Sequence, residues 1–263
     1  MKKAGAWPAA LAALLVALAA WFGFDLEALL GPQSAPAPQA EAPAPPAPAP
    51  GAPAGPAAGT PAARPVPAGD FDYYVLALSW SPSYCEAEAT ERDKLQCGGR
   101  PFHFIVHGLW PQNERGYPED CPTDAPRVGD ALVDDLLDIM PSRGLIGHEW
   151  RSHGACTGMS QEDYFAEVRA AFETVDIPDR FEVLEQAVTI APSEIAREFL
   201  GANSGKLTAD AIVVTCGGGS RLDEVRLCMD KQLRFRACGQ QTQRSACRRQ
   251  QVRMPPVRGA MPP

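Results

Sequence analysis

The chain has 263 residues, enough for one large folded domain or two small ones, and its 45% hydrophobic content is ordinary for a globular protein. Its formal net charge is −8 and its pI is about 5.1. This acidic balance excludes a protein that coats nucleic acid with a broad positive surface, so any contact with phosphate groups must be local.

Residues 1–30 have the pattern of an export segment. Lys2 and Lys3 precede an uncharged stretch that runs as far as Asp25. A basic start and an apolar stretch are typical of a signal peptide, while the uncharged length is close to the roughly 20 residues that span a bilayer. A buried core helix is the remaining alternative. We therefore expect export, through a cleaved signal peptide or, as the preferred interpretation, an uncleaved membrane anchor.

Residues 31–69 are rich in proline and alanine and hold 13 of the chain's 27 prolines. A segment of this composition cannot pack a core, because proline lacks the amide donor and favours extended conformations. We expect a semi-rigid spacer here, with a binding site for a proline-reading module as the less favoured alternative. The folded domain then occupies residues 70–263.

Strand and helix patterns are intermixed in this domain without regular alternation. Aromatic and branched side chains predict five strands, at residues 73–80, 102–107, 211–216, 222–229 and 232–237. Apolar stripes at helical spacing predict one helix around residues 132–140 and another after Ser160, which forms a capping box with Asp163. Short links between successive strands favour antiparallel pairing. The predicted fold class is therefore α+β, an antiparallel sheet with helices packed against it.

All eight cysteines lie in the predicted domain, between Cys85 and Cys247. An even number in an exported chain predicts four disulfides, although eight cysteines allow 105 pairings and the sequence alone cannot choose among them. A structural zinc site is the alternative. We disfavour zinc because no two of these cysteines have C-x-x-C spacing.

The four histidines fall in two short segments, Pro101-Phe-His-Phe-Ile-Val-His-Gly-Leu-Trp-Pro111 and His148-Glu-Trp-Arg-Ser-His-Gly-Ala-Cys156. Histidine changes its charge near neutral pH, so a pair of histidines suits a reaction that needs both an acid and a base. In the first segment, strand alternation places His103 and His107 on one face. We expect His107 to end this strand, where Gly108 lets the chain turn towards a cleft, and we interpret His103 as an ordinary core or surface histidine.

As an ideal helix, the second segment places His148, Glu149, Ser152 and His153 on one broad face, with Arg151 pointing elsewhere. The H-E-x-x-H motif of a metalloprotease sets its two histidines about 40° apart on a helix. The two histidines here are separated by one residue more, which opens the angle to about 140° and disfavours a catalytic zinc site.

These two segments together resemble the two active-site motifs of the T2 family of ribonucleases. Ser79-Trp-Ser-Pro-Ser-Tyr-Cys85 resembles the family's first strand, and the stretch from Cys216 to Cys247 resembles its C-terminal hairpins, so the likeness spans the whole predicted domain. The resemblance implies a ribonuclease T2-like fold and cleavage of RNA to 2′,3′-cyclic phosphates, with the ribose 2′-hydroxyl as nucleophile. It implies no metal, no other cofactor and no action on DNA, which lacks that hydroxyl.

The resemblance also implies a role for each residue of the motifs. His153 would be the general base and His107 the general acid, while His148 would hold the phosphate and Glu149 would orient or polarise it. Trp110, and Tyr117 beyond the motif, would stack against a base.

One position departs from the family's pattern. The family commonly has a lysine where this chain has Ser152, and a cation there can stabilise the negative charge that develops on the phosphate. The substrate-binding set therefore includes Ser152 and Arg151, and the missing charge would have to come from Arg151 or from another arginine. Residues 226–258 carry nine basic residues and one acidic residue. This positive excess would guide RNA to the site, or the segment would be a solvated tail.

The resemblance further implies the cysteine pairing: Cys85 with Cys97, Cys121 with Cys156, Cys216 with Cys247, and Cys228 with Cys238. The sequence as a whole predicts a monomeric, metal-independent endoribonuclease that acts on single-stranded RNA in the periplasm or outside the cell. The alternative is a catalytically weak domain that keeps the same scaffold and binds RNA or a protein.

Overall fold

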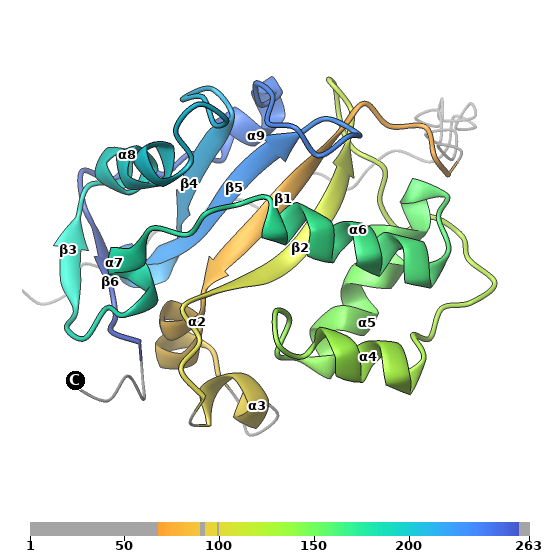
Figure 1. The fold of residues 1–263 in the computed structure, drawn as a ribbon, viewed down its shortest axis with the longest axis horizontal. Coiled ribbons are helices and arrows are strands. Elements are labelled where there is room, and N and C mark those ends of the chain that lie inside the picture. Colours follow the sequence, from red (N-terminus) through yellow and green to blue (C-terminus); the bar gives the residue numbers. More distant parts are fainter. Residues whose placement is uncertain (1–67, 90–92, 99, 258–263) are drawn as a thin grey trace, which may run out of the picture. The chain divides into compact units, whose positions relative to one another are not determined.

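The structure is a computed structural model that describes residues 68–89, 93–98 and 100–257 (Figure 1). The predicted export segment and nearly all of the predicted spacer lie outside the described residues. Within the described part, no helix is both long enough and apolar enough to cross a membrane.

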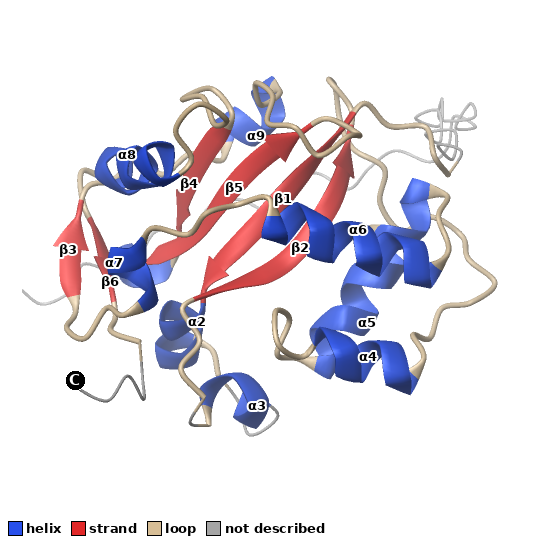
Figure 2. Cartoon of the chain, viewed as in Figure 1, coloured by secondary structure: helices blue, strands red, loops and turns tan. Residues whose placement is uncertain are grey.

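A four-stranded antiparallel sheet runs through the domain in the order β2-β1-β5-β4 (Figure 2). Its strands are β1 (Tyr73–Trp80), β2 (Phe104–Gln112), β4 (Ile212–Cys216) and β5 (Leu222–Met229). Two short strands, β3 (Val188–Ile190) and β6 (Val252–Met254), pair separately. The predicted α+β class and the strands predicted at 73–80, 211–216 and 222–229 are confirmed to within one residue.

Two predicted strands need correction. The strand predicted at residues 102–107 begins at Phe104 and continues to Gln112. Residues 232–237 form a turn with one isolated bridge instead of a strand. The Asp230 side chain accepts hydrogen bonds from the backbone amides of Gln232 and Arg234, and Leu233 has a positive φ of 58°, so the chain folds back locally before it can extend.

The helices pack mainly on one face of the sheet, and both predicted helices are present, although the one predicted around residues 132–140 ends at Leu136. Ser160 caps the second of them, because its Oγ accepts a hydrogen bond from the Asp163 amide at 3.1 Å. The α-helices are α2 (Ser81–Ala87), α3 (Lys94–Cys97), α4 (Asp130–Leu136), α5 (Arg143–Ser152), α6 (Gln161–Glu173), α7 (Asp179–Glu182), α8 (Pro192–Ala202) and α9 (Gln240–Arg244). Two 3₁₀ turns, η3 (Gly154–Thr157) and η4 (Gly218–Ser220), complete the described elements.

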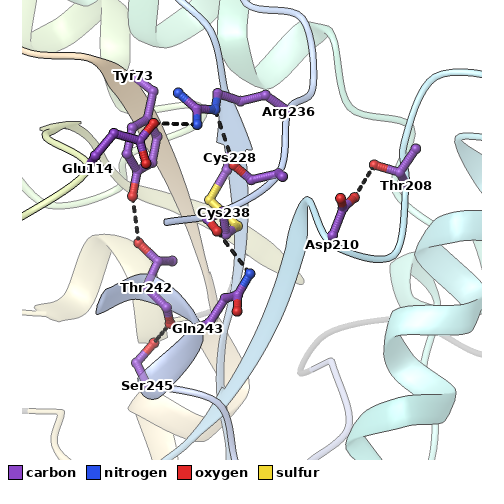
Figure 3. The surroundings of a disulfide bond; sticks show 11 residues. Tyr73, Glu114, Thr208, Asp210, Cys228, Arg236, Cys238, Thr242, Gln243 and Ser245 are labelled. Atoms are coloured by element: carbon purple, nitrogen blue, oxygen red, sulfur yellow. Dashed lines mark hydrogen bonds and ion pairs between the residues drawn. A yellow bond between two sulfur atoms is a disulfide. The ribbon is translucent and has the colours of Figure 1, made fainter. Parts of the chain in front are cut away.

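The two faces of the sheet differ in what covers them. Leu76 and Leu78 of β1 join the main apolar core, to which α4, α5, α6, α7 and α8 contribute. Tyr73 and Val75 point to the other face and belong to a second, smaller apolar cluster. There the Tyr73 and Thr242 hydroxyls share a hydrogen bond of 3.2 Å, which ties α9 to the sheet (Figure 3). This second face is only partly covered, so it has room for polar side chains.

Four disulfides link the described cysteines: Cys85–Cys97, Cys121–Cys156, Cys216–Cys247 and Cys228–Cys238. They are the four pairs that the family resemblance implies. The second bridge joins the segment after β2 to η3, and therefore ties together the two histidine-bearing parts of the chain.

Candidate active site

A β-bulge in β2 directs His107. Residues three apart in a regular strand point to opposite faces, yet the rings of His107 and Trp110 lie on the same face with centroids 5.3 Å apart. Adjacent residues of β1 pair with Val106 and Gly108, so His107 is the extra residue of the bulge. The prediction that His107 ends its strand, with a chain turn at Gly108, is therefore wrong.

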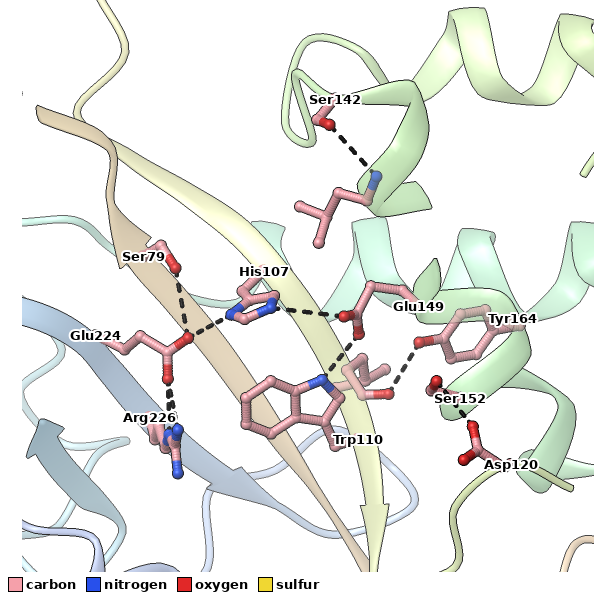
Figure 4. Close-up of polar contacts among 12 residues, drawn as sticks. Ser79, His107, Trp110, Asp120, Ser142, Glu149, Ser152, Tyr164, Glu224 and Arg226 are labelled. Atoms are coloured by element: carbon pink, nitrogen blue, oxygen red, sulfur yellow. Dashed lines mark hydrogen bonds and ion pairs between the residues drawn. The ribbon is translucent and has the colours of Figure 1, made fainter. Parts of the chain in front are cut away.

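The imidazole of His107 lies between two buried carboxylates from distant parts of the chain (Figure 4). Nδ1 hydrogen-bonds to Glu224 of β5, and Nε2 lies 3.6 Å from Oε1 of Glu149 in α5. Burial lowers the pKa of His107, but the hydrogen bond and charge of Glu224, with the charge of Glu149, outweigh burial and raise it above its ordinary value. His107 therefore holds a proton more firmly than an ordinary histidine, with Nδ1 bound to Glu224 and Nε2 without a hydrogen bond to any described residue.

Glu224 and Arg226 are functional candidates that the sequence reasoning missed. Glu224 is 3% exposed, and Oε2 accepts a 2.8 Å hydrogen bond from Arg226 Nε. Burial raises the pKa of Glu224, but His107 and Arg226 act in the opposite direction and hold it at about 2. A signal was available, because Glu224 and Arg226 stand in alternate positions of the strand and therefore share one face, where opposite charges can pair.

Helix α5 brings Glu149 against the edge strand β2. The Glu149 carboxylate is 1% exposed, and Oε2 accepts a hydrogen bond from Trp110 Nε1 at 2.8 Å. A Cβ atom at Gly108 would lie only 1.9 Å from Oε2, so glycine is needed for this approach. Burial raises the pKa of Glu149 to about 7, although His107 and Trp110 lower it. Glu149 thus holds two rings of the site in place.

The second histidine motif is helical only as far as Ser152. Helix α5 ends there, and His153 has φ −127° and ψ −48° before the chain continues as η3. The prediction that His148, Glu149, Ser152 and His153 share one helix face is therefore wrong, because the last of them leaves the helix. The backbone amide of His153 still donates to the Glu149 carbonyl at 3.0 Å, which closes the final turn.

Trp110 brings the two imidazoles together. Its ring contacts His107 and also His153, whose ring centroid lies 5.5 Å from that of the indole. Burial, followed by the charges of His148 and His107, lowers the pKa of His153 to about 4. At neutral pH His153 is therefore a neutral proton acceptor, while the pKa of His107 is shifted in the opposite direction. Two titratable groups with pKa values driven apart are the usual sign of an acid and base pair.

The structure does not bring Ser152 or Arg151 to the two imidazoles. Ser152 is buried, and its Oγ donates to Asp120 Oδ1 at 2.9 Å. Arg151 is exposed and folds back along α5, since a Cβ atom on Gly147 would lie 3.2 Å from its Nη1. His148 is also exposed, close enough to His153 for its charge to act on that ring.

Two hollows lie beside Trp110 and the histidines. The first, which we call the His153 hollow, has a volume of about 310 Å³ and is lined by Trp110, Tyr117 and His153, among others. The second, the His107 hollow, has a volume of about 540 Å³ and is lined by residues that include His107 and Glu224. Both volumes suit a small ligand group. The described residues contain no cluster of three or more His, Cys, Asp or Glu side chains that could hold a metal ion.

The family model described as "Ribonuclease T2 family" matches residues 71–238, which is more than half of the chain. The chain belongs to the ribonuclease T2 family. The matched residues include both histidine motifs and strand β5, so all the polar groups of the site lie inside the family region.

Curated relatives agree with this family assignment, and a solved structure agrees with the fold. A ribonuclease of Aeromonas hydrophila is 47% identical over 97 residues, which are 37% of this chain and 43% of that protein, so the match spans less than half of the relative. Ribonuclease DdI of Dictyostelium discoideum is 28% identical over 186 residues, 62% of this chain and 75% of that protein. An RNase-related protein from Calystegia sepium superimposes with a TM-score of 0.55 at 19% identity, over 71% of this chain and 98% of that one. The predicted ribonuclease T2-like fold is confirmed.

Proposed function

We propose that this chain is an endoribonuclease that cleaves single-stranded RNA by transphosphorylation, releasing 2′,3′-cyclic phosphates without a metal or other cofactor. One observation carries the proposal: the rings of His107 and His153 both contact Trp110, and their pKa values are shifted in opposite directions. An acid and a base are the groups that this reaction requires of the enzyme, because the RNA itself supplies the nucleophile.

In the proposed reaction, neutral His153 removes the proton from the ribose 2′-hydroxyl. The 2′-oxygen then attacks the adjacent phosphorus, and the bond from phosphorus to the 5′-oxygen breaks. Protonated His107 gives the proton on Nε2 to the departing 5′-oxygen, while Glu224 stabilises the charged ring through Nδ1. Each of the two proton transfers typically contributes 10²–10⁴-fold to the rate. DNA is not a substrate because it has no 2′-hydroxyl.

The remaining roles follow the position of each side chain. His148, exposed beside His153, binds the phosphate, and Glu149 positions His107 and Trp110. Trp110 and Tyr117 line the His153 hollow, where a base can stack once it is free of a double helix, which favours single-stranded RNA. Ser152 and Arg151 have no substrate role in this proposal, because their contacts take them elsewhere.

The proposed domain organisation keeps residues 1–30 as an export segment, residues 31–69 as a spacer and residues 70–263 as the catalytic domain, acting as a monomer. Four disulfides support a location in the periplasm or outside the cell, because disulfides persist in oxidising compartments.

Digestion of single-stranded RNA in the presence of a chelator tests the proposal. We expect cyclic phosphate products, and we expect His107→Ala and His153→Ala each to lower the rate on the order of 10²–10⁴-fold. His103→Ala is the control, because His103 precedes β2 and lines neither hollow. The rate should fall below a pKa of about 4 for His153 and above the raised pKa of His107, giving a bell-shaped profile. Chelator-sensitive cleavage, or RNA binding without cleavage, would contradict the proposal.

A further inference from the structure

The second histidine motif brings no lysine or arginine to the phosphate, which in the proposed function it contacts through His148. The inference here rests on that proposed function, in which extra negative charge develops on the phosphate as the 2′-oxygen attacks. Ser152 carries no charge and is bound to Asp120, while Arg151 lies along the exposed side of α5. A lysine or arginine that stabilises this charge must therefore come from another element.

Strand β5 places Arg226 beside the two imidazoles. Ala77 of β1 pairs with Gly108 on one side and with Arg226 on the other, so these three residues form a row across the sheet. Ala77 and Gly108, on the β1 side of Arg226, are small and leave space for its long side chain, while Val213 of β4 is its neighbour on the other side. The guanidinium lies over the ring of Trp110, with Cζ 5.0 Å from the centroid.

The guanidinium of Arg226 is held in place by Glu224, but one of its nitrogens makes no hydrogen bond to the described residues. Nε and Nη2 are each 2.8 Å from Oε2 of Glu224, which fixes the plane of the group. Among the described residues, Nη1 has no hydrogen-bond partner. The side chain is 24% exposed, and of the arginines and lysines that line the two hollows it is the one that lines both.

We propose that Arg226 binds the non-bridging oxygens of the scissile phosphate through Nη1 and stabilises their charge in the transition state. A phosphodiester between His153 and His107 lies between the two hollows, where Arg226 is located. Glu224 contacts both His107 and Arg226, so these two groups share its carboxylate. Because Glu224 holds the guanidinium before the substrate arrives, little reorganisation accompanies the reaction.

Arg226 also has a structural role, so a matched control is required. Arg236 has the same kind of environment: its Cζ lies 4.6 Å from the centroid of Tyr73, and its Nη2 pairs with Glu114 at 2.6 Å (Figure 3). Its side chain is 30% exposed, but it lines neither hollow. Replacing Arg236 therefore removes a ring contact and an ion pair, here to the exposed carboxylate of Glu114, without removing a phosphate ligand.

The experiment compares Arg226→Gln, Arg226→Lys and Arg236→Gln in the full chain, with a dinucleotide as substrate. We expect Arg226→Gln to lower kcat on the order of 10²–10³-fold with a smaller change in KM, since the contact strengthens in the transition state. Arg226→Lys should recover part of the loss, and Arg236→Gln should keep the wild-type rate. Equal losses in Arg226→Gln and Arg236→Gln would overturn the proposal.

A phosphorothioate substrate provides a readout that a purely structural role would not change. Sulfur in place of the oxygen that faces Arg226 should slow the wild-type enzyme for one of the two diastereomers. Arg226→Gln should lose this preference while keeping the bell-shaped pH profile, and an unchanged preference would overturn the proposal. If Arg226→Gln does not fold, as judged by thermal unfolding, the same comparison is made with Arg226→Lys.

Binding of inorganic phosphate separates this inference from the proposed function. If the wild-type chain does not cleave RNA, the proposed function fails, and phosphate titration followed by NMR still tests Arg226. Weaker phosphate binding by Arg226→Gln than by Arg236→Gln supports the phosphate contact, and equal binding by the two variants refutes it.

Discussion

The disulfide between Cys121 and Cys156 should contribute both to stability and to the geometry of the site. Replacing both cysteines with alanine removes a cross-link between residues 35 positions apart, which by loop-closure entropy costs about 4 kcal/mol at 25 °C. Next to the bridge, the Asp120 amide donates to the Ser152 carbonyl at 2.9 Å, and Ser152 Oγ donates to the Asp120 carboxylate. These contacts set the position of His153, the next residue along the chain.

The matched control is the disulfide between Cys216 and Cys247. Its residues are 31 positions apart, so the same model gives the same cost of about 4 kcal/mol, but the bridge joins the end of β4 to the segment after α9. Urea unfolding followed by tryptophan fluorescence measures stability, and RNA cleavage by the folded fraction measures kcat. We expect equal losses of stability and a larger loss of kcat without Cys121–Cys156, up to about 10²-fold for a displacement near 1 Å. Equal kcat values in the two variants would refute the reasoning.

Two further predictions concern Gly108 and Glu224. Gly108→Ala places a Cβ atom 1.9 Å from Glu149 Oε2, and we expect a loss of about 1–3 kcal/mol in unfolding free energy together with lower activity. Gly201→Ala, where nothing lies within 4 Å of the added atom, should leave both unchanged or raise stability slightly, and a similar loss in both variants would contradict the clash. Glu224→Gln removes the largest influence that raises the pKa of His107, so the alkaline limb of the pH–rate profile should move to lower pH. The neighbouring Asp223→Asn should move that limb much less, and equal shifts would show that Glu224 has no special role.

Local signals explain most of what could be predicted from the sequence. Strand β5 and the capping of α6 by Ser160 depend on neighbouring residues, so pattern and propensity are sufficient for both. The fold class, the two histidine motifs and the pairing of the cysteines were also accessible, the last through the resemblance to a family.

The two errors at the site have a common physical origin, since each depends on contacts between segments distant in the chain. The bulge at His107 arises from the register between β1 and β2. The alternation of apolar and polar residues along β2 does not indicate where one extra residue is inserted. The end of α5 at Ser152 coincides with contacts to Asp120 and with the nearby disulfide, which a helical wheel does not include.

The sequence by itself determined the composition of the site: two histidine motifs, a nearby tryptophan and a serine where the family commonly has a lysine. Only the tertiary structure decided how these groups are charged and which arginine accompanies them. Glu224 lies 117 positions from His107 in the chain, yet it is the group that most raises the pKa of this histidine, and it also pairs with Arg226, which lies over Trp110. The contact between His107 and Glu224 follows from the order of strands in the sheet. Only β1 lies between β2 and β5, so side chains of these two strands can meet on one face.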